Sequence, residues 1–324
     1  MGALVGAGAV LVALLLVSVS VGAVVVPPAD VLPGLFDPDS ASYFIVHELR
    51  LSRAVVGMLA GIGLAVGGAI LQSLVRNPLA SPDVIGITKG AGFLAAGVIF
   101  LFPKSPLYML PLTAFAGALA AFLLLLALSR RLTLSPSAIA LIGVAIGAVF
   151  QAGIQYLLVT NPTNINMALL WLSGSLWSRG WPQVGYLLPA MAVLVPLALA
   201  SYRKLNVLQL GDESSVSLGL SLAGDRFWLF LLAVGLAGVS VSAVGAIGFV
   251  GLLAPHIARR LVGGRQQWLL PLAALLGADL MLLGDCLGRV ILIPREVPVG
   301  IMTAIIGAPY FVYLLRRERQ RTVR

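Results

Sequence analysis

The chain has 324 residues, of which 60% are hydrophobic and 10% charged, and its mean hydropathy is +1.04. A soluble domain of this length needs a far more charged surface, so the composition indicates an all-α polytopic protein of the lipid bilayer, with one transmembrane domain over residues 1–324. The net charge of +9 first indicates basic cytoplasmic loops in such a protein, and we expect no nucleic-acid partner.

Ten segments are each expected to form a membrane-spanning helix. The first has no Lys or Arg before it and is longer than the apolar core of a signal peptide, so we interpret it as a retained span. A polar segment, residues 205–222, separates the sixth span from the seventh. In chain order, the expected spans are 4–26, 52–74, 87–102, 107–128, 136–159, 183–201, 227–246, 248–262, 267–287 and 298–315.

The basic residues predict how these spans are oriented. An even number of spans places both termini on one side of the membrane. With the termini in the cytoplasm, 15 of the 21 basic residues lie on the inner side, as cytoplasmic loops prefer. The six on the outer side are Arg50, Arg53, Lys104, Arg179, Arg289 and Arg295.

The second span is the most informative stretch of the sequence. Arg50 and Arg53 precede it, Gln72 lies near its end, and the turn that follows contains Asn77 and Pro78. Small residues at four-residue spacing let helix backbones approach closely, so we expect this helix to be surrounded by other helices. The glycines with this spacing are Gly57, Gly61, Gly63 and Gly67 in the second span, and Gly143 and Gly147 in the fifth.

Several motifs in this chain resemble one family of permeases. They are Arg-Leu-Ser-Arg at 50–53, Arg-Asn-Pro-Leu-Ala-Ser-Pro-Asp at 76–83, Leu-Trp-Leu-Ser-Gly-Ser-Leu-Trp at 170–177, the Gly-rich stretch 245–264 and Arg-Glu-Val-Pro-Val-Gly at 295–300. Together they resemble the permeases of iron-siderophore and vitamin B12 ABC importers, and most of all the ferric citrate permease subunits. The resemblance extends over nearly the whole chain.

This resemblance implies the membrane subunit of an ATP-driven importer that carries a ferric chelate across the bacterial inner membrane. The implied partners are a second permease subunit, identical or paralogous, two ATPase subunits and an extracytoplasmic binding protein. It also implies an inverted repeat of spans 2–5 and 7–10. Since none of the lysines lies in a phosphate-binding loop motif, the chain is not expected to be an enzyme or to bind a cofactor. ATP and Mg²⁺ are expected on the partner ATPase.

The polar segment 205–222 is the candidate contact with that ATPase. Asp212 and Glu213 are placed where acidic residues favour the start of a short helix, and Gly219 is placed to end it. An ordinary solvated loop is the alternative on local pattern alone. The resemblance favours short cytoplasmic helices that rest in a cleft of the ATPase. The candidate coupling residues are Leu210, Gly211, Asp212, Glu213, Ser214, Leu218 and Gly219.

The resemblance also identifies Arg50, Arg53 and Arg289 as candidate docking residues for the binding protein. All three lie on the outer side in the predicted topology. The alternative is that they anchor helix ends at lipid headgroups.

The remaining polar residues of the spans are assigned structural roles. His256 follows Pro255 and is expected to be buried with a satisfied hydrogen bond, since no second metal ligand is near it in sequence. We therefore expect no metal site. Asp285 lies four residues before Arg289, the spacing of a pair on one helix face. Asn77, Pro78 and Glu296 are also placed in this structural group.

Two other functions remain open on the sequence. One is a proton-coupled secondary transporter in which Asp279 and Asp285 carry the proton, because carboxylates inside a membrane are candidates for such relays. The other is an ABC permease for cobalamin or haem.

Overall fold

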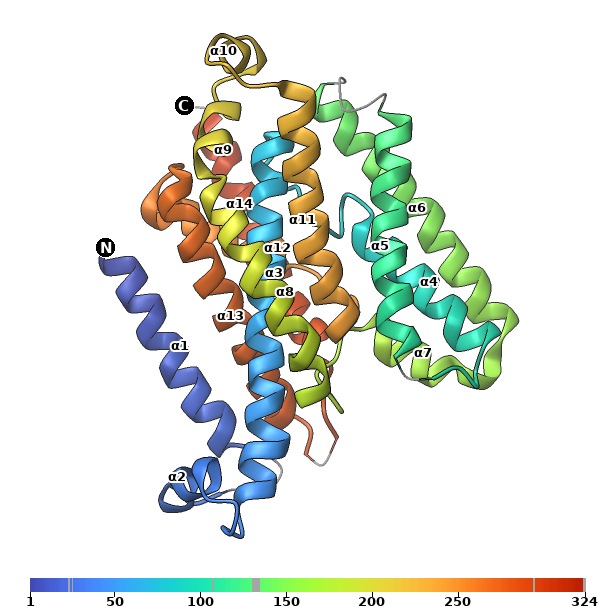
Figure 1. Ribbon diagram of the computed structural model, residues 1–324, viewed down its shortest axis with the longest axis vertical. Coiled ribbons are helices and arrows are strands. Elements are labelled where there is room, and N and C mark those ends of the chain that lie inside the picture. The colour runs from blue at the N-terminus through green and yellow to red at the C-terminus, as the bar shows by residue number, and fades with distance from the viewer. Residues whose placement is uncertain (23, 25, 107, 130–134, 294, 323–324) are drawn as a thin grey trace.

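The computed structural model describes residues 1–324 except 23, 25, 107, 130–134, 294 and 323–324, with side chains described up to residue 312. The described residues form helices and connecting segments without a strand (Figure 1). Arg130 and Arg131, which follow the fourth expected span at 107–128, lie outside the described residues.

The helices follow one another through the chain with short connections. They are α1 (Gly2–Ser20), α2 (Pro28–Phe36), the π-helix η1 (Phe44–Leu51), α3 (Ser52–Val75), α4 (Ile87–Leu101), α5 (Met109–Leu128), α6 (Pro136–Thr160), the 3₁₀-helix η2 (Pro162–Asn164), α7 (Ile165–Leu172), α8 (Trp181–Ala200), α9 (Tyr202–Leu208), α10 (Asp212–Ser217), α11 (Leu222–Val244), α12 (Val250–Val262), α13 (Gln266–Val290) and α14 (Val299–Thr322).

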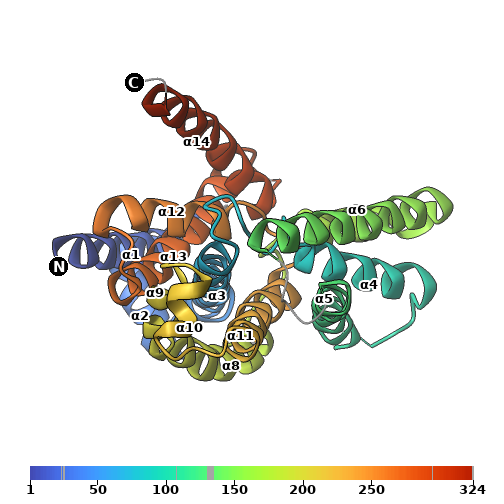
Figure 2. The ribbon, with the colours of Figure 1, turned by 90° about the horizontal axis from the view of Figure 1, so that it is seen from above.

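Helix α3 lies at the centre of the bundle, where α8, α11, α12 and α13 pack around it (Figure 2). In the most apolar part of η1 and α3, 83% of the residues are buried inside the protein. In α1 only 17% of the corresponding residues are buried, so α1 exposes most of its apolar surface. Since every face of α3 contacts protein, its sequence is apolar all round and shows no polar stripe.

The crossing of α3 and α13 depends on a pair of glycines. Gly61 of α3 and Gly277 of α13 face each other so closely that a Cβ atom on either one would collide with the backbone oxygen of the other. This is the close backbone approach that small residues permit between helices in a bilayer.

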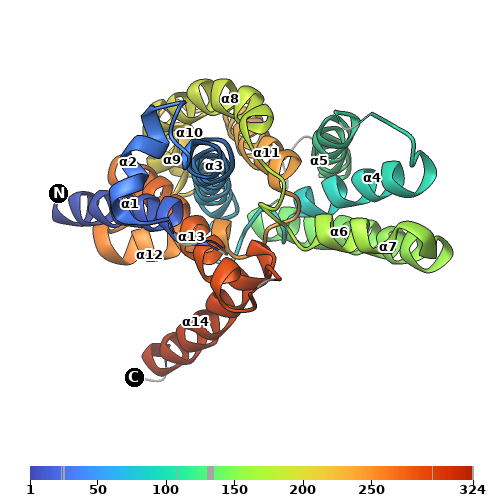
Figure 3. The same ribbon diagram turned by 90° about the horizontal axis from the view of Figure 1, so that it is seen from below.

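A second group of helices, α4 to α7, stands beside the central bundle, and α14 projects from the bundle in another direction (Figure 3). The turn between α3 and α4 connects the two groups: a Cβ atom on Gly143 of α6 would lie 2.9 Å from the Cα atom of Ile85. The two ends of the bundle differ in structure. We call them the α10 end, at the top of Figure 1, and the α2 end, at the bottom.

Among the described residues, seven helices are long and apolar enough to cross a membrane: α1, η1 with α3, α5, α6, α8, α11 and α13. Two shorter apolar helices, α4 and the Val299–Val312 part of α14, lie at two further expected spans. Helix α12 occupies the range of the eighth expected span, but it has only 13 residues and carries Arg259 and Arg260 in its last turn. The protein therefore spans the membrane several times.

Candidate functional site

At the α10 end, one carboxylate connects three helices. Arg226, near the start of α11, donates a hydrogen bond from Nη2 to Oδ1 of Asp212 across 2.7 Å. Arg76, which ends α3, also donates a hydrogen bond to Asp212 and another, of 3.0 Å, to the carbonyl oxygen of Leu208. Asp212 is the first residue of α10, so this short helix is attached to both α3 and α11.

The protonation of Asp212 follows from these contacts. Partial burial acts to raise its pKa, but the hydrogen bonds from Arg226 and Arg76 outweigh burial and hold the pKa below its ordinary value of 3.8. The carboxyl group is therefore ionised throughout the physiological pH range, and its ion pairs persist there.

The C-terminal turn of α10 has the hydrogen-bond pattern of a Schellman motif. The Leu220 amide donates to the carbonyl oxygen of Ser215 at 3.0 Å, and the Gly219 amide donates to that of Val216 at 2.9 Å. Gly219 has a φ of +86°, which a residue with a Cβ atom adopts only at a cost. Gly219 thus has the helix-ending position expected from the sequence.

The surface of this segment is unusually apolar. The side chains of Leu210, Val216 and Leu218 are 63%, 56% and 61% exposed, although the segment also carries Asp212 and Glu213. Exposed apolar residues gathered on one small polar element are typical of a protein interface.

Helix α9 is attached to the bundle through a network of amide and hydroxyl groups. Gln266 of α13 donates a hydrogen bond to Ser73 of α3 at 3.0 Å, and Gln209 donates to the same hydroxyl at 3.4 Å. Asn206 of α9 accepts a bond of 2.9 Å from the Gln266 amide. The whole segment from α9 to α10 is therefore connected to the central helices.

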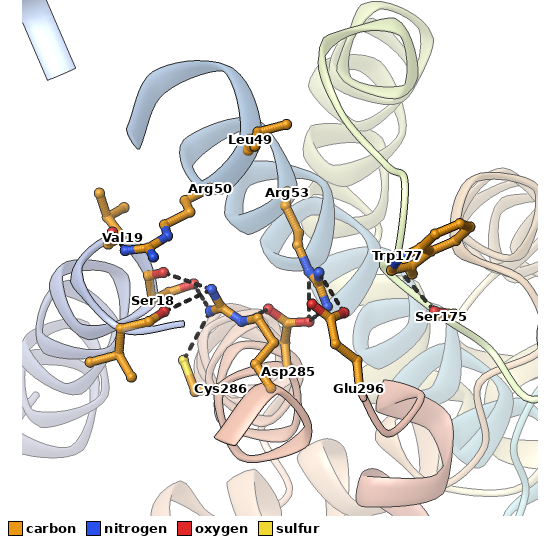
Figure 4. Close-up of polar contacts among 12 residues, drawn as sticks. Ser18, Val19, Leu49, Arg50, Arg53, Ser175, Trp177, Asp285, Cys286 and Glu296 are labelled. Atoms are coloured by element: carbon orange, nitrogen blue, oxygen red, sulfur yellow. Dashed lines mark hydrogen bonds and ion pairs between the residues drawn. The ribbon is translucent and has the colours of Figure 1, made fainter. Parts of the chain in front are cut away.

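At the α2 end, a second cluster contains two of the three candidate docking arginines (Figure 4). Arg53 donates hydrogen bonds from Nε and Nη2 to Oδ1 of Asp285, at 3.0 and 2.8 Å, and forms an ion pair of 2.8 Å with Glu296. Arg289 forms an ion pair with the other oxygen of Asp285 at 3.1 Å. Asp285, whose side chain is 1% exposed, therefore lies between two guanidinium groups.

Arg50 and Arg289 point inward, toward the end of α1. Arg289 donates to the carbonyl oxygens of Ser18 and Val21, both at 3.0 Å. Arg50 donates to the carbonyl oxygens of Val19, Ser20 and Val24. The last carbonyl groups of a helix lack partners within it, so the two arginines supply donors to the end of α1. This helix ends at Ser20, before the expected limit of the first span at residue 26.

The burial of these three arginines determines which of them a docked protein could contact. Arg50 and Arg289 are only 7% and 6% exposed, and both are surrounded by protein rather than by lipid. The Arg53 side chain is 14% exposed, and its ionic partner Glu296 is 32% exposed. Of the three arginines, Arg53 is the one nearest to a partner at the surface, and docking through all three stays a prediction.

The turn after α3 is formed by local contacts. The side chain of Asn77 accepts a hydrogen bond from the Leu79 amide at 2.9 Å, which fixes the turn around Pro78. Gln72, which is 2% exposed, donates to the carbonyl oxygen of Leu252 at 3.2 Å and so links α3 to α12.

The candidate packing glycines all contact neighbouring elements. In α3, Gly57 faces Leu176, Gly61 faces Gly277, Gly63 faces Ser240 and Gly67 faces the carbonyl oxygen of Ala233. In α6, Gly143 faces Ile85 and Gly147 faces Gly86.

His256 lies inside α12, one residue after Pro255. Its Nε2 atom accepts a hydrogen bond of 3.1 Å from Arg260, and its ring makes an edge contact with Tyr310. Asp279 of α13 is 7% exposed, and its Oδ1 atom makes no hydrogen bond within the described chain. Asp279 and Asp285 have separate surroundings. No group of three His, Cys, Asp or Glu side chains that could hold a metal ion occurs among the described residues.

Sequence reasoning did not identify Arg76, Arg226, Ser73 or Gln266 as part of a site. Arg76 and Asp212 are 136 positions apart, and Ser73 and Gln266 are 193 apart. The contact between Asp212 and Arg226 is closer in sequence, because the two residues are only fourteen positions apart. An acidic helix start followed by a nearby arginine is the feature that could have indicated it.

Comparisons with known proteins identify relatives over almost the full length of the chain. The model of the FecCD transport family matches residues 10–317. The Fe(3+)-citrate import system permease protein YfmE of Bacillus subtilis (strain 168) is 49% identical over 312 residues, which are 96% of this chain and 94% of the relative. The Fe(3+) dicitrate transport system permease protein FecD of Escherichia coli (strain K12) is 45% identical, with 86% of each chain covered.

A solved structure has the same fold. It is described as an inward-facing conformation of a metal-chelate type ABC transporter, and it matches with a TM-score of 0.87 at 30% identity. The match covers 97% of this chain and 98% of the other.

Proposed function

This chain belongs to the FecCD transport family, and we propose that it carries a ferric citrate complex through the bacterial inner membrane. It is a permease homologous to ferric citrate and siderophore permeases of ABC importers, as the resemblance in its sequence motifs implied. Ferric citrate is proposed as the cargo because this chain is 49% and 45% identical to two permeases named for ferric citrate. The permease named for iron(3+)-hydroxamate is 37% identical.

We propose that the segment 205–222 couples this chain to a pair of ATPase subunits, which bind ATP and Mg²⁺. The support is the exposed apolar surface of Leu210, Val216 and Leu218 on a segment attached firmly to the bundle. Because Asp212 connects α10 to α3 and α11, a displacement of α10 by an ATPase would be transmitted to α3, the central helix of the bundle, and to α11. The permease itself needs no bound cofactor for this role.

We propose that an extracytoplasmic binding protein docks at the α2 end, on the surface around Arg50, Arg53 and Arg289. Arg53 is the residue that forms an ion pair with the binding protein, because its present pair with Glu296 is partly exposed. A carboxylate of the binding protein replaces Glu296 at Arg53. Such an exchange of ion partners governs the association rate and the docking orientation more than the affinity.

We further propose that two permease subunits form the pathway and that the second is a paralogue. In Bacillus subtilis (strain 168), two different proteins, YfmE and YfmD, are named as permeases for Fe(3+)-citrate import. Both are relatives of this chain, at 49% and 39% identity. Two different permeases of one family, named for the same cargo, are what an importer with paralogous subunits would contain.

The proposed topology has ten spans, with both termini in the cytoplasm and an inverted repeat of spans 2–5 and 7–10. The seven long helices, the apolar helices α4 and α14, and α12 supply these ten spans. The coupling segment then faces the cytoplasm, and the arginine cluster faces outward.

The surroundings of Asp285 argue against the rival function of proton-coupled transport. Asp285 forms ion pairs with both Arg53 and Arg289, so its carboxylate joins α3 to α13 and has a structural role. Asp279 alone does not make a relay.

The experiment is to measure ATP hydrolysis by the reconstituted importer, with its binding protein, while the ferric chelate is varied. Ferric citrate should raise the rate above the basal value, and a hydroxamate siderophore, cobalamin and haem should not. Stimulation by one of these other compounds, without stimulation by ferric citrate, would identify a different cargo. Lack of stimulation by every chelate would contradict an ATP-driven importer.

A further inference from the structure

A cavity of about 1030 Å³ opens at the α2 end, between α5 and α8. Its wall is formed by α11, which Figure 2 shows between those two helices. This volume lies just above the range of about 300–1,000 Å³ that is usual for ligand pockets. The cavity belongs to neither of the polar clusters described above.

Most of the cavity lining is apolar, and its rim is exposed. Leu112 and Tyr108, at the start of α5, are 63% and 66% exposed, while Phe115 and Val239 lie deeper in the structure. In a membrane protein, apolar side chains exposed on the outside of the bundle face lipid. Exposed aromatic residues at the end of a span are typical of the membrane interface, and Trp177, which is 58% exposed, lies in the same region of the chain as Arg179.

One cation, Arg179, lies in the lining of this mostly apolar cavity. The Nε atom of Arg179 is buried and makes no hydrogen bond, and the side chain forms no ion pair with the described residues. Glu48 also lines the cavity, but its carboxylate lies 4.0 Å from Nε2 of His47. Burial lowers the pKa of the Arg179 guanidinium, and the neighbouring Tyr186 only partly offsets that effect. A half-buried guanidinium whose buried Nε atom has no hydrogen-bond partner is unfavourable, so the site is complementary to an anionic group from outside.

We propose that this cavity binds one phospholipid of the bilayer, with its phosphate against Arg179 and an acyl chain along α11 between α5 and α8. A planar guanidinium matches the geometry of a phosphate. The apolar surface of Leu112, Phe115 and Val239 continues from the charged position along the helix axis, as the chain of a lipid does from its headgroup. In the proposed topology, this lipid belongs to the outer leaflet.

A free phosphate ion fits the site less well, because it would leave the apolar part of the cavity open to water. The position of Arg179 at the end of the spans also matches the depth of a headgroup. The lipid would fill the groove between α5 and α8, and so support the contact of the α4–α7 group with the central bundle.

The test uses the importer purified through this chain, in nanodiscs that contain phosphatidylglycerol with a diazirine in one acyl chain. After irradiation, mass spectrometry should locate adducts on the first turns of α5 and on the last turns of α11, near Val239. Arg179→Gln should lower labelling at these positions about tenfold, the change expected for loss of one charge-assisted contact. The matched control is Arg295→Gln, which removes an exposed arginine outside the cavity and should leave labelling unchanged.

A second variant keeps the test independent of any folding defect in Arg179→Gln. Leu112→Trp changes an exposed side chain and narrows the groove without altering the charge, and it should also lower labelling. Labelling that is equal in the wild type and both variants would overturn the proposal. Loss of labelling on addition of millimolar inorganic phosphate would overturn it too, since the site would then bind the free ion.

Discussion

Arg226 donates a hydrogen bond to Asp212 across 2.7 Å, and this contact attaches the first residue of α10 to the start of α11. Arg76 reaches the same carboxylate from the end of α3. A surface helix of six residues is too short to be stable alone. Its position is therefore determined by this carboxylate and by the network around Ser73, and the proposed ATPase contact depends on them.

The first prediction concerns the carboxylate of Asp212. Asp212→Asn removes both ion pairs while retaining the size of the side chain. Partly exposed pairs are each worth about 0.2–1 kcal/mol, so the ATPase subunits should copurify several-fold less well and transport should fall in parallel. Asp30→Asn changes an exposed acidic residue in the first turn of α2, at the other end of the bundle, and should leave copurification of the ATPase subunits unchanged.

The pH dependence of this effect has a definite sign. Because the pKa of Asp212 is lowered in the folded protein, its stabilising contribution is complete above the ordinary value of 3.8 and is lost as the pH falls through the lowered pKa. Lowering the cytoplasmic pH from about 7.5 to about 5.5 should therefore not reproduce the Asp212→Asn defect. A defect that appears in the wild type over this range would contradict the ion-pair account.

The second prediction concerns the turn at Gly219. Gly219→Val places a β-branched residue at a φ of +86°, at a cost of roughly 1–2 kcal/mol. The variant should insert into the membrane normally yet lose transport and ATPase contact. Gly185→Val is the control, since Gly185 has an ordinary φ and open space around its Cβ position. Full transport by Gly219→Val would mean that the turn is not required.

The third prediction concerns the exchange of partners at Arg53. Glu296→Gln removes the exposed partner while Asp285 still pairs with Arg53, so Arg53 is more available to a partner carboxylate. The association rate with the binding protein should rise about threefold at low salt and less at high salt. Stopped-flow fluorescence would measure this rate.

The control for that experiment is Asp39→Asn, which removes an exposed carboxylate at the same end of the bundle that forms no ion pair with the described residues. An equal increase in both variants would mean that the net charge of this surface, and not the pairing of Arg53, sets the association rate. Arg53 would then not be part of the docking site. Arg53→Gln should slow association in the same assay.

The fourth prediction concerns orientation. In a background in which Cys286 is replaced, Ser214→Cys should react with impermeant thiol reagents only from the cytoplasmic side. Ser105→Cys, in the connection between α4 and α5, should react only from outside. Reaction of both from the same side would contradict the ten-span topology.

Much of the local structure was predictable from residue type and spacing. Acidic residues at 212 and 213 and a glycine at 219 indicated a short helix between them, because helix starts and ends have strong local preferences. Four-residue spacing paired Asp285 with Arg289, and the structure contains that ion pair. The family resemblance was confirmed by relatives over almost the whole chain.

The tertiary contacts of the same residues were not predictable from local pattern. Arg53 and Asp285 are 232 positions apart, and Arg50 contacts carbonyl groups that any residue could supply. The sequence marks such arginines as charged and near the outer surface, but it does not indicate that Arg50 and Arg289 turn inward to the end of α1. For the same reason, it did not indicate the cavity at Arg179, whose walls come from four separate parts of the chain.

The most direct test of the central claim is uptake of radioactive ferric citrate into proteoliposomes that contain the whole importer, with ATP inside and the binding protein outside. Iron should accumulate with ATP and not with a non-hydrolysable analogue, and an ionophore that collapses the proton gradient should not reduce it. Asp279→Asn should also transport normally. Uptake that persists without ATP hydrolysis and stops with the ionophore would contradict the account and support a proton-coupled transporter.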